Sequence, residues 1–238
     1  MGIIKRNNKL INSLAGEVYK ESDAIIDLRS DYGVTKDVSN NVSQVKLYNN
    51  PSKLFRDNSS NCIENGDGFD FSANISGYLK GGFSSDFDSF FIGFWAKLNT
   101  LTPSGERIVY SHDESPLRGW RVYFLGTHLL IYTGFSTVIL QTNGYVGNSD
   151  QWEYFTIERN SSGGYVGTTG GIVRTKANNT QTFLAHNYSG IVGNALVNLT
   201  KKFDGSLDDL ILKENSPYNS FDFALGEQVF TPPKRSSE

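Results

Sequence analysis

The sequence is poor in the residues that would cross-link it, build a metal cluster or attract nucleic acid. Its 238 residues include one cysteine, Cys62, so neither an internal disulfide nor a cysteine-rich metal site can form. The 22 Lys and Arg residues are outnumbered by 25 Asp and Glu, and the net charge of −3 offers no basic surplus to DNA, RNA or an anionic membrane. Packing and hydrogen bonds must therefore hold the fold, and no nucleic-acid partner is expected.

Long apolar runs are also missing. No stretch of about 18 apolar residues occurs, so membrane insertion is not expected. The opening residues, MGIIKRNNKLINSLAG, carry basic residues without an apolar segment after them, and so do not predict a secretory signal. We therefore expect synthesis and folding in a cytoplasm. Residues 1–20 are interpreted as an N-terminal arm or short helix, which either covers the domain or docks it onto a larger assembly.

Aromatic residues and glycines are frequent, at 13% aromatic content and 24 Gly. Aromatic and β-branched residues favour sheet, and Gly, Asn and Ser favour the turns between strands. Short apolar segments with turn signals about every 8–12 residues predict an all-β sandwich or barrel. Because no repeat of solenoid period and no long linker interrupts the pattern, we expect one domain over residues 21–238, after the arm.

Three segments predict particular strands. Residues 90–98 (FFIGFWAKL) are apolar on both alternating sets, which indicates a strand covered on both sides. Residues 120–132 predict a hairpin joined by Gly126 and Thr127, a Gly-X loop that suits a type II′ turn. Residues 152–158 (WEYFTIE) alternate between apolar and polar positions, as expected of a strand with one face on the core.

Four segments, in this order, resemble the concanavalin A-like lectin/glucanase superfamily, and in particular the laminin-G-like domains of bacteriophage virion proteins. The last is followed by Tyr218 and by Phe-Thr-Pro-Pro at 230–233, an ending common in phage-borne members. The resemblance implies a jelly-roll β-sandwich of two antiparallel sheets, although Glu153 stands where the family usually has His. The segments are residues 69–79 (FDFSANISGYL), 90–98, 151–159 (QWEYFTIER) and 203–212 (FDGSLDDLIL).

The acidic pair Asp208 and Asp209 lies in the last of these segments. A carboxylate at the entry of a strand can accept nearby backbone N–H groups, so both acids are interpreted as structural. Neighbouring strand residues point to opposite faces, which hinders joint chelation of one ion. Calcium ligation by this pair stays the alternative, because some laminin-G-like domains bind calcium; no other cofactor is expected.

The sequence contains none of the catalytic motifs expected of an enzyme on this fold. The Glu-x-Asp-x-x-Glu strand of glycoside hydrolases on this fold is missing, and the three histidines lack zinc-site spacing. No G-x-S-x-G elbow and no phosphate-binding loop occurs. We therefore predict a protein that is not an enzyme, with a polysaccharide-degrading enzyme as the weakest alternative.

Aromatic residues in predicted loops, each beside a polar residue, are the candidates for glycan binding. Sugar rings stack on aromatic faces while polar side chains hydrogen-bond the hydroxyls. The alternative for each ring is that it only caps an edge of the sandwich. The candidates are Trp120 with Arg118 and the nearby Asp113, Tyr145 with Asn143, and Tyr188 with Asn187.

The phage-type ending and the missing catalytic set predict a bacteriophage virion structural protein. Its lectin-like domain would stand on the tail, fibre, baseplate or capsid surface and mediate adhesion to a host-surface glycan. Expected partners are other virion proteins, reached through the N-terminal arm, and further copies of the chain in a homo-oligomer. The alternative is a purely architectural capsid or tail decoration protein without a ligand.

Overall fold

The computed structural model describes the chain in segments. In residues 112–119, 133, 137–141 and 189–192, and throughout the segments before residue 89, it describes the backbone alone. The arm predicted for residues 1–20 lies outside the described residues. No helix in the described segments is long and apolar enough to cross a membrane. These segments are residues 24–29, 36–37, 46–47, 63–65, 68–70, 77–82, 89–100, 105–115, 118–133, 137–141, 151–179, 189–193, 203–213 and 215–235.

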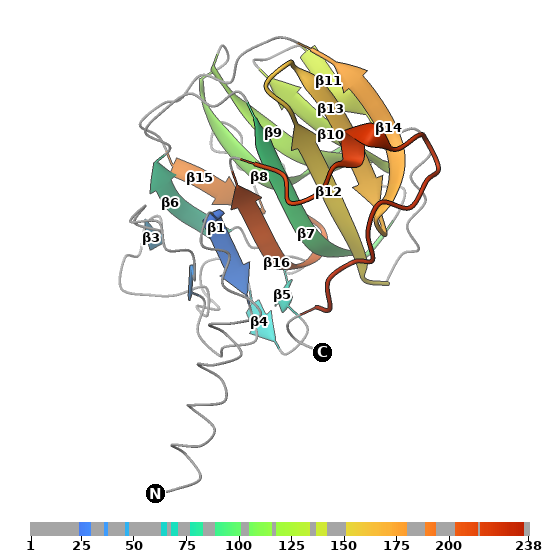
Figure 1. The fold of residues 1–238 in the computed structure, drawn as a ribbon. Coiled ribbons are helices and arrows are strands. Elements are labelled where there is room, and N and C mark those ends of the chain that lie inside the picture. The colour runs from blue at the N-terminus through green and yellow to red at the C-terminus, as the bar shows by residue number, and fades with distance from the viewer. Residues whose placement is uncertain are drawn as a thin grey trace, which may run out of the picture.

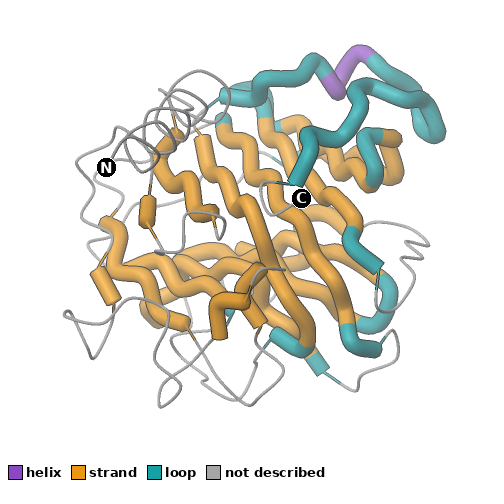
Figure 2. The backbone as a smooth tube through the Cα atoms, turned by 90° about the horizontal axis from the view of Figure 1, so that it is seen from below, coloured by secondary structure: helices purple, strands orange, loops and turns teal. Residues whose placement is uncertain are grey.

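Two antiparallel sheets face each other as the two layers of a sandwich (Figures 1 and 2). In the described residues, one sheet has nine strands in the order β14-β13-β12-β7-β16-β1-β2, with β5 also on β16 and β4 on β5; the other has seven, in the order β11-β10-β9-β8-β15-β6-β3. The predicted fold class is thus confirmed. The strands are β1 (Ala24–Arg29), β2 (Lys36–Asp37), β3 (Lys46–Leu47), β4 (Ile63–Asn65), β5 (Gly68–Asp70), β6 (Gly77–Gly82), β7 (Phe90–Leu98), β8 (Glu106–Ser115), β9 (Arg118–Leu125), β10 (His128–Thr133), β11 (Thr137–Gln141), β12 (Glu153–Arg159), β13 (Gly164–Thr169), β14 (Ile172–Asn178), β15 (Ser189–Val192) and β16 (Gly205–Lys213).

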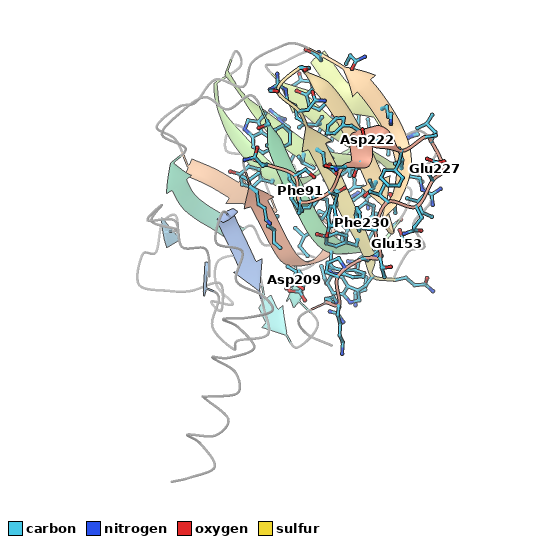
Figure 3. The ribbon with its side chains drawn as sticks, viewed as in Figure 1. Phe91, Glu153, Asp209, Asp222, Glu227 and Phe230 are labelled. Carbon is cyan, nitrogen blue, oxygen red and sulfur yellow. The ribbon has the colours of Figure 1, made fainter. Side chains whose placement is uncertain are left out.

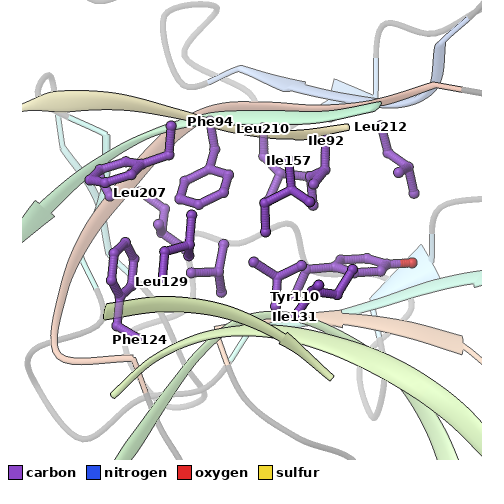
Figure 4. Close-up of a cluster of buried hydrophobic side chains, with 14 of the residues drawn as sticks. Ile92, Phe94, Tyr110, Phe124, Leu129, Ile131, Ile157, Leu207, Leu210 and Leu212 are labelled. Atoms are coloured by element: carbon purple, nitrogen blue, oxygen red, sulfur yellow. The ribbon is translucent and has the colours of Figure 1, made fainter. Parts of the chain in front are cut away.

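The core fills the space between the sheets with every second side chain of the central strands (Figure 4). Phe94 of β7 stacks on Phe155 of β12 with ring centroids 5.5 Å apart, and Phe124 of β9 meets Phe155 edge-on at 5.1 Å. Each such aromatic pair contributes about 0.5–1.5 kcal/mol beyond the buried area. The aromatic residues of the sequence thus join the two layers.

The predicted hairpin is confirmed. Strands β9 and β10 pair from Leu125 with His128 to Trp120 with Thr133, and Gly126 and Thr127 form the loop. Gly126 has φ +57°, the positive sign that a II′ turn requires at its first central residue.

Strand β7 is covered on both sides, as its sequence predicts. Phe90, Ile92 and Phe94 face the core between the sheets. Phe91 faces the other way and is also buried, against Ile211 of β16 and Tyr218. The cover on this outer side comes from the end of the chain.

Residues 215–235, here called the C-terminal strap, cross the outer face of the nine-stranded sheet and contain the short 3-10 helix η2 (Ser220–Asp222) (Figure 2). Tyr218 stacks on Phe230 at 3.8 Å between ring centroids and meets Phe91 edge-on at 5.7 Å. Figure 3 shows Phe91 and Phe230 on the side of the sheet that the strap covers. The strap therefore gives the nine-stranded sheet a second, smaller apolar layer.

A β-bulge interrupts strand β16 at the acidic pair. The pairing with β7 shifts between Asp208 and Ile211, and Asp209 has φ +44°. The extra residue turns Leu207 and Leu210 to the same side, so both reach the core. Asp208 and Asp209 thus lie inside the strand at a bulge, rather than at its entry as predicted.

Candidate functional site

Strands β8, β9 and β10 carry a polar and aromatic cluster on the outer face of the seven-stranded sheet. Because side chains alternate along a strand, Trp120, Val122 and Phe124 point into the core and the residues between them point outward. The outward cluster, here called the tyrosine patch, consists of Glu106 from β8, Arg121 and Tyr123 from β9, and Tyr132 from β10.

An ion pair and two ring contacts fix the geometry of the tyrosine patch. Arg121 donates from Nη1 to Glu106 Oε2 at 3.2 Å, and the two side chains are 8% and 28% exposed. The Arg121 guanidinium lies over the Tyr132 ring, 5.4 Å from its centroid. Tyr123 and Tyr132 meet edge to face with centroids 6.3 Å apart. Tyr132 and Glu106 are therefore the more accessible members, with Arg121 behind them.

A small apolar base supports the patch from the same face. Ile108 of β8 and Leu130 of β10 pair with Tyr123 on either side and are buried with it. Tyr132 packs against this group and stays partly exposed. The rings are thus held by packing in one orientation, which lowers the entropy that a ligand must remove on binding.

Both phenols of the patch keep their protons at neutral pH. Burial, with the negative charge of Glu106, raises the pKa of Tyr123 to about 12, while Arg121 opposes the rise. Burial also raises the pKa of Tyr132, again against the effect of Arg121. The patch therefore presents O–H donors, carboxylate acceptors, guanidinium donors and aromatic faces, with its two formal charges balanced.

The structure corrects the prediction for Trp120, which is not a loop residue. Strand β9 begins two residues before it, and the Trp120 ring is buried in the core, 1% exposed. It stacks on Phe90 at 5.4 Å and lies 5.0 Å from the Tyr110 ring. A ring enclosed by the core cannot stack on a sugar, so Trp120 is structural, and the outward residues of the same strand take its place as candidates.

The other predicted glycan contacts divide into two groups. Arg118 lies in β9 and Asp113 in β8, at the far end of the β8–β9 pair, where Ser115 pairs with Arg118 and Asp113 with Gly119. Both are thus strand residues near the turn between the strands, where a loop was predicted. The remaining candidates lie outside the described residues: Asn143, Tyr145, Asn187 and Tyr188.

The Asp208 carboxylate is engaged within the protein. Its Oδ1 accepts the backbone N–H of Asp209 at 2.9 Å, as predicted for a structural role, and its Oδ2 lies 3.6 Å from Arg235 Nη1 of the strap. Asp208 is buried and Asp209 nearly so. In the part of the chain that the structure describes, no group of three or more His, Cys, Asp or Glu side chains forms a potential metal site.

Sequence comparison finds no family: no family model matches the chain, and no curated protein matches it. Solved structures do match in fold. Domain 4 of the extracellular GH43 arabinanase AbnA from Geobacillus stearothermophilus, solved in complex with arabinotriose, is 14% identical with a TM-score of 0.62, over 82% of this chain and 94% of that one.

The binding domains of two toxins are also similar to this chain in fold, at low sequence identity. The botulinum neurotoxin serotype D ligand-binding domain in complex with N-acetylneuraminic acid is 12% identical with a TM-score of 0.58, over 82% of this chain. The binding domain of Paraclostridial Mosquitocidal Protein 1 is 15% identical with a TM-score of 0.57. This chain spans about half of each toxin domain, 48% and 49%. At these identities the likeness establishes the β-sandwich fold.

Proposed function

We propose that this chain is a non-enzymatic lectin-like module that binds a saccharide through the tyrosine patch. The observation that carries the proposal is the patch itself, in which two packed tyrosines and a Glu–Arg pair lie on one outer sheet face. Aromatic faces and fixed polar groups are what a sugar ring and its hydroxyls require. The likeness to an arabinanase domain and a toxin binding domain, each solved with a saccharide, supports the same class of ligand.

The charge balance of the patch favours a neutral saccharide. Glu106 already neutralises Arg121 at 3.2 Å, so an acidic sugar would have to displace that carboxylate. Neutral hydroxyl groups can instead donate to Glu106 and accept from the guanidinium and the phenols. A neutral oligosaccharide such as arabinotriose is therefore the first probe, and N-acetylneuraminic acid the second.

Calorimetric titration with the two probes, followed by an array of neutral and acidic glycans, tests the proposal. Tyr132→Ala should weaken binding of the neutral ligand about tenfold or more, which corresponds to a loss of about 1.4 kcal/mol. The matched control is Leu225→Ala, which truncates a residue 64% exposed on the strap and should leave affinity unchanged. Equal affinity of Tyr132→Ala and the parent protein, or a preference for the acidic glycans, would contradict the proposal.

We further propose that the module works on a bacteriophage particle and attaches it to a host-surface glycan. The support is the phage-type ending formed by residues 203–212, Tyr218 and residues 230–233. Predicted additional contacts to the glycan are Asp113, Arg118, Asn143, Tyr145, Asn187 and Tyr188. Quantitative mass spectrometry of particles, with and without residues 1–20 of this chain, tests both the location and the predicted docking arm. Incorporation with no binding to host cells would favour the purely architectural alternative.

A further inference from the structure

The C-terminal strap is held to the nine-stranded sheet at several places along its sequence, which include the contacts of Phe221 with Lys176 and of Arg235 with Asp208. Near its end, Val173 N–H donates to Glu227 O, Gly226 N–H to Val173 O and Val229 N–H to Gly171 O, each at 2.9 Å. Near its start, the strap meets one buried acidic side chain of the sheet, Glu158 of β12.

The Glu158 carboxyl lies under the strap with no exposed surface. It projects outward from β12, opposite Phe91 of β7 and Val166 of β13. Its side-chain hydrogen bonds go to two serines of the strap: Ser216 Oγ at 2.6 Å from Oε2, and Ser220 Oγ at Oε1. Within the described residues these bonds reach the strap alone, so Glu158 joins the sheet to the strap.

The hydrogen-bond geometry at Ser216 favours a proton on Glu158. Ser216 Oγ accepts the backbone N–H of Tyr218 at 3.0 Å, and lies 2.8 Å from Tyr218 O and 2.6 Å from Glu158 Oε2. A hydroxyl has one proton, so it can donate to one of the two oxygens. If Glu158 is neutral and donates to Ser216, the serine donates to Tyr218 O and every contact is satisfied. If Glu158 is ionised, two acceptors compete for one proton.

We propose that the strap is a pH-sensitive latch, closed while the Glu158 carboxyl is protonated and loosened when it ionises. Burial raises the pKa of Glu158 to about 7, although the hydrogen bonds from Ser216 and Ser220 oppose that rise. The proton favoured by the geometry is thus present in mildly acidic solution and leaves near neutrality.

The charged groups around Glu158 do little to hold it ionised. In the row of paired residues across the sheet, Lys213 of β16 pairs with Phe91, and Lys176 of β14 pairs with Val166. The backbone of each lysine therefore lies two strands away from that of Glu158, about 10 Å, and Lys176 Nζ donates to Phe221 O of the strap. The next residue of β12, Arg159, lies over the Tyr165 ring in the core. On the strap, the acidic Asp222 is exposed and Glu227 bonds the Ala224 N–H.

Hydrogen exchange of the strap amides of Tyr218, Gly226 and Val229, corrected for the intrinsic pH dependence of exchange, tests the latch on the whole chain. If Glu158 titrates at about 7 in the closed strap and at an ordinary 4.5 in the open one, protection should fall about 30-fold from about pH 5.5 to 8.5. Glu158→Gln, which is neutral at both pH values, should abolish that fall. Asp222→Asn, which changes an exposed acid on the same strap, should keep it.

Two results would overturn the latch: protection that is equal at both pH values in the parent protein, or a fall of the same size in Glu158→Gln. If that variant does not fold, carboxyl-carbon NMR of the parent protein decides the question. A Glu158 titration midpoint near the ordinary value of 4.5, or one uncoupled from strap protection, would equally refute the proposal.

Discussion

Gly170 and Gly171, at the turn between β13 and β14, provide a matched pair for measuring what the strap contributes to stability. Both have positive φ, +59° and +77°. A Cβ on Gly170 would meet nothing within 4 Å, whereas one on Gly171 would lie 2.0 Å from the carbonyl oxygen of Phe230. Gly170→Ala therefore introduces backbone strain alone, and Gly171→Ala introduces the same strain together with a collision against the strap.

The difference between the two variants can be worked out from the contacts that the collision breaks. A non-glycine residue in the left-handed region costs about 1–2 kcal/mol, which is the loss expected for Gly170→Ala. Moving Phe230 away also removes the hydrogen bond from Val229 N–H to Gly171 O, about 1 kcal/mol, and the stacking of Phe230 on Tyr218, about 1 kcal/mol. We expect Gly171→Ala to lose about 3–4 kcal/mol in total.

Urea unfolding followed by tryptophan fluorescence measures both losses at one pH. The free energy of unfolding should be lower for Gly171→Ala than for Gly170→Ala by about 2 kcal/mol, from the hydrogen bond and the stacking. Amide exchange at Val229 should become faster in Gly171→Ala only. Equal losses in the two variants would refute the reasoning, because the strap would then contribute nothing at this contact.

Three further predictions concern the core and the buried charges. Since the folded pKa of Glu158 is raised, stability should fall as pH rises from about 4.5 to about 7, by about 3 kcal/mol, and Glu158→Gln should remove this slope in urea unfolding. Phe94→Ala should cost about 3–5 kcal/mol, because it leaves a cavity beside Phe155 and Phe124; thermal unfolding measures it, and a loss below about 1 kcal/mol would contradict the described core. Arg235→Met should cost about 2–3 kcal/mol, because it removes the cation beside buried Asp208 and the contact over Trp152; an unchanged urea midpoint would contradict it.

The strands with a strong local pattern could be predicted from the sequence. In residues 90–98 both alternating sets are apolar, and the structure buries one set between the sheets and covers Phe91 from outside. In residues 152–158 the alternation predicts an apolar set on the core, and Phe155 and Ile157 do lie there. The polar set was expected to lie apart from the core, yet Thr156 and Glu158 are buried as well. Thr156 bonds Thr168 of the neighbouring strand, whereas the serines that cover Glu158 are more than 50 residues away in sequence, so no local pattern could reveal them.

For the candidate site, the sequence predicts the right strand but the wrong face. Trp120 stands at the start of the predicted strand, a position that predicts a loop setting for its ring. Pairing with β8 extends the strand back to Arg118, which turns Trp120 inward and Arg121 and Tyr123 outward. Once the start of the strand is known, the alternation in residues 120–125 (WRVYFL) predicts which side chains point inward and which point outward. Contact between Arg121 and Glu106 depends on the register of two strands, which the sequence does not specify by itself.

Strand β14 ends the nine-stranded sheet, and such a strand would normally expose a row of unpaired backbone groups to any neighbouring chain. Here the strap bonds to Gly171 and Val173 and forms a bridge between Ile172 and Gln228, so part of that row is already occupied. The strap residues that cover the sheet therefore also cap its edge strand and hinder pairing with a second chain. A chain truncated before residue 215 should therefore expose the edge of β14. Its solubility should decline even if the two sheets still fold.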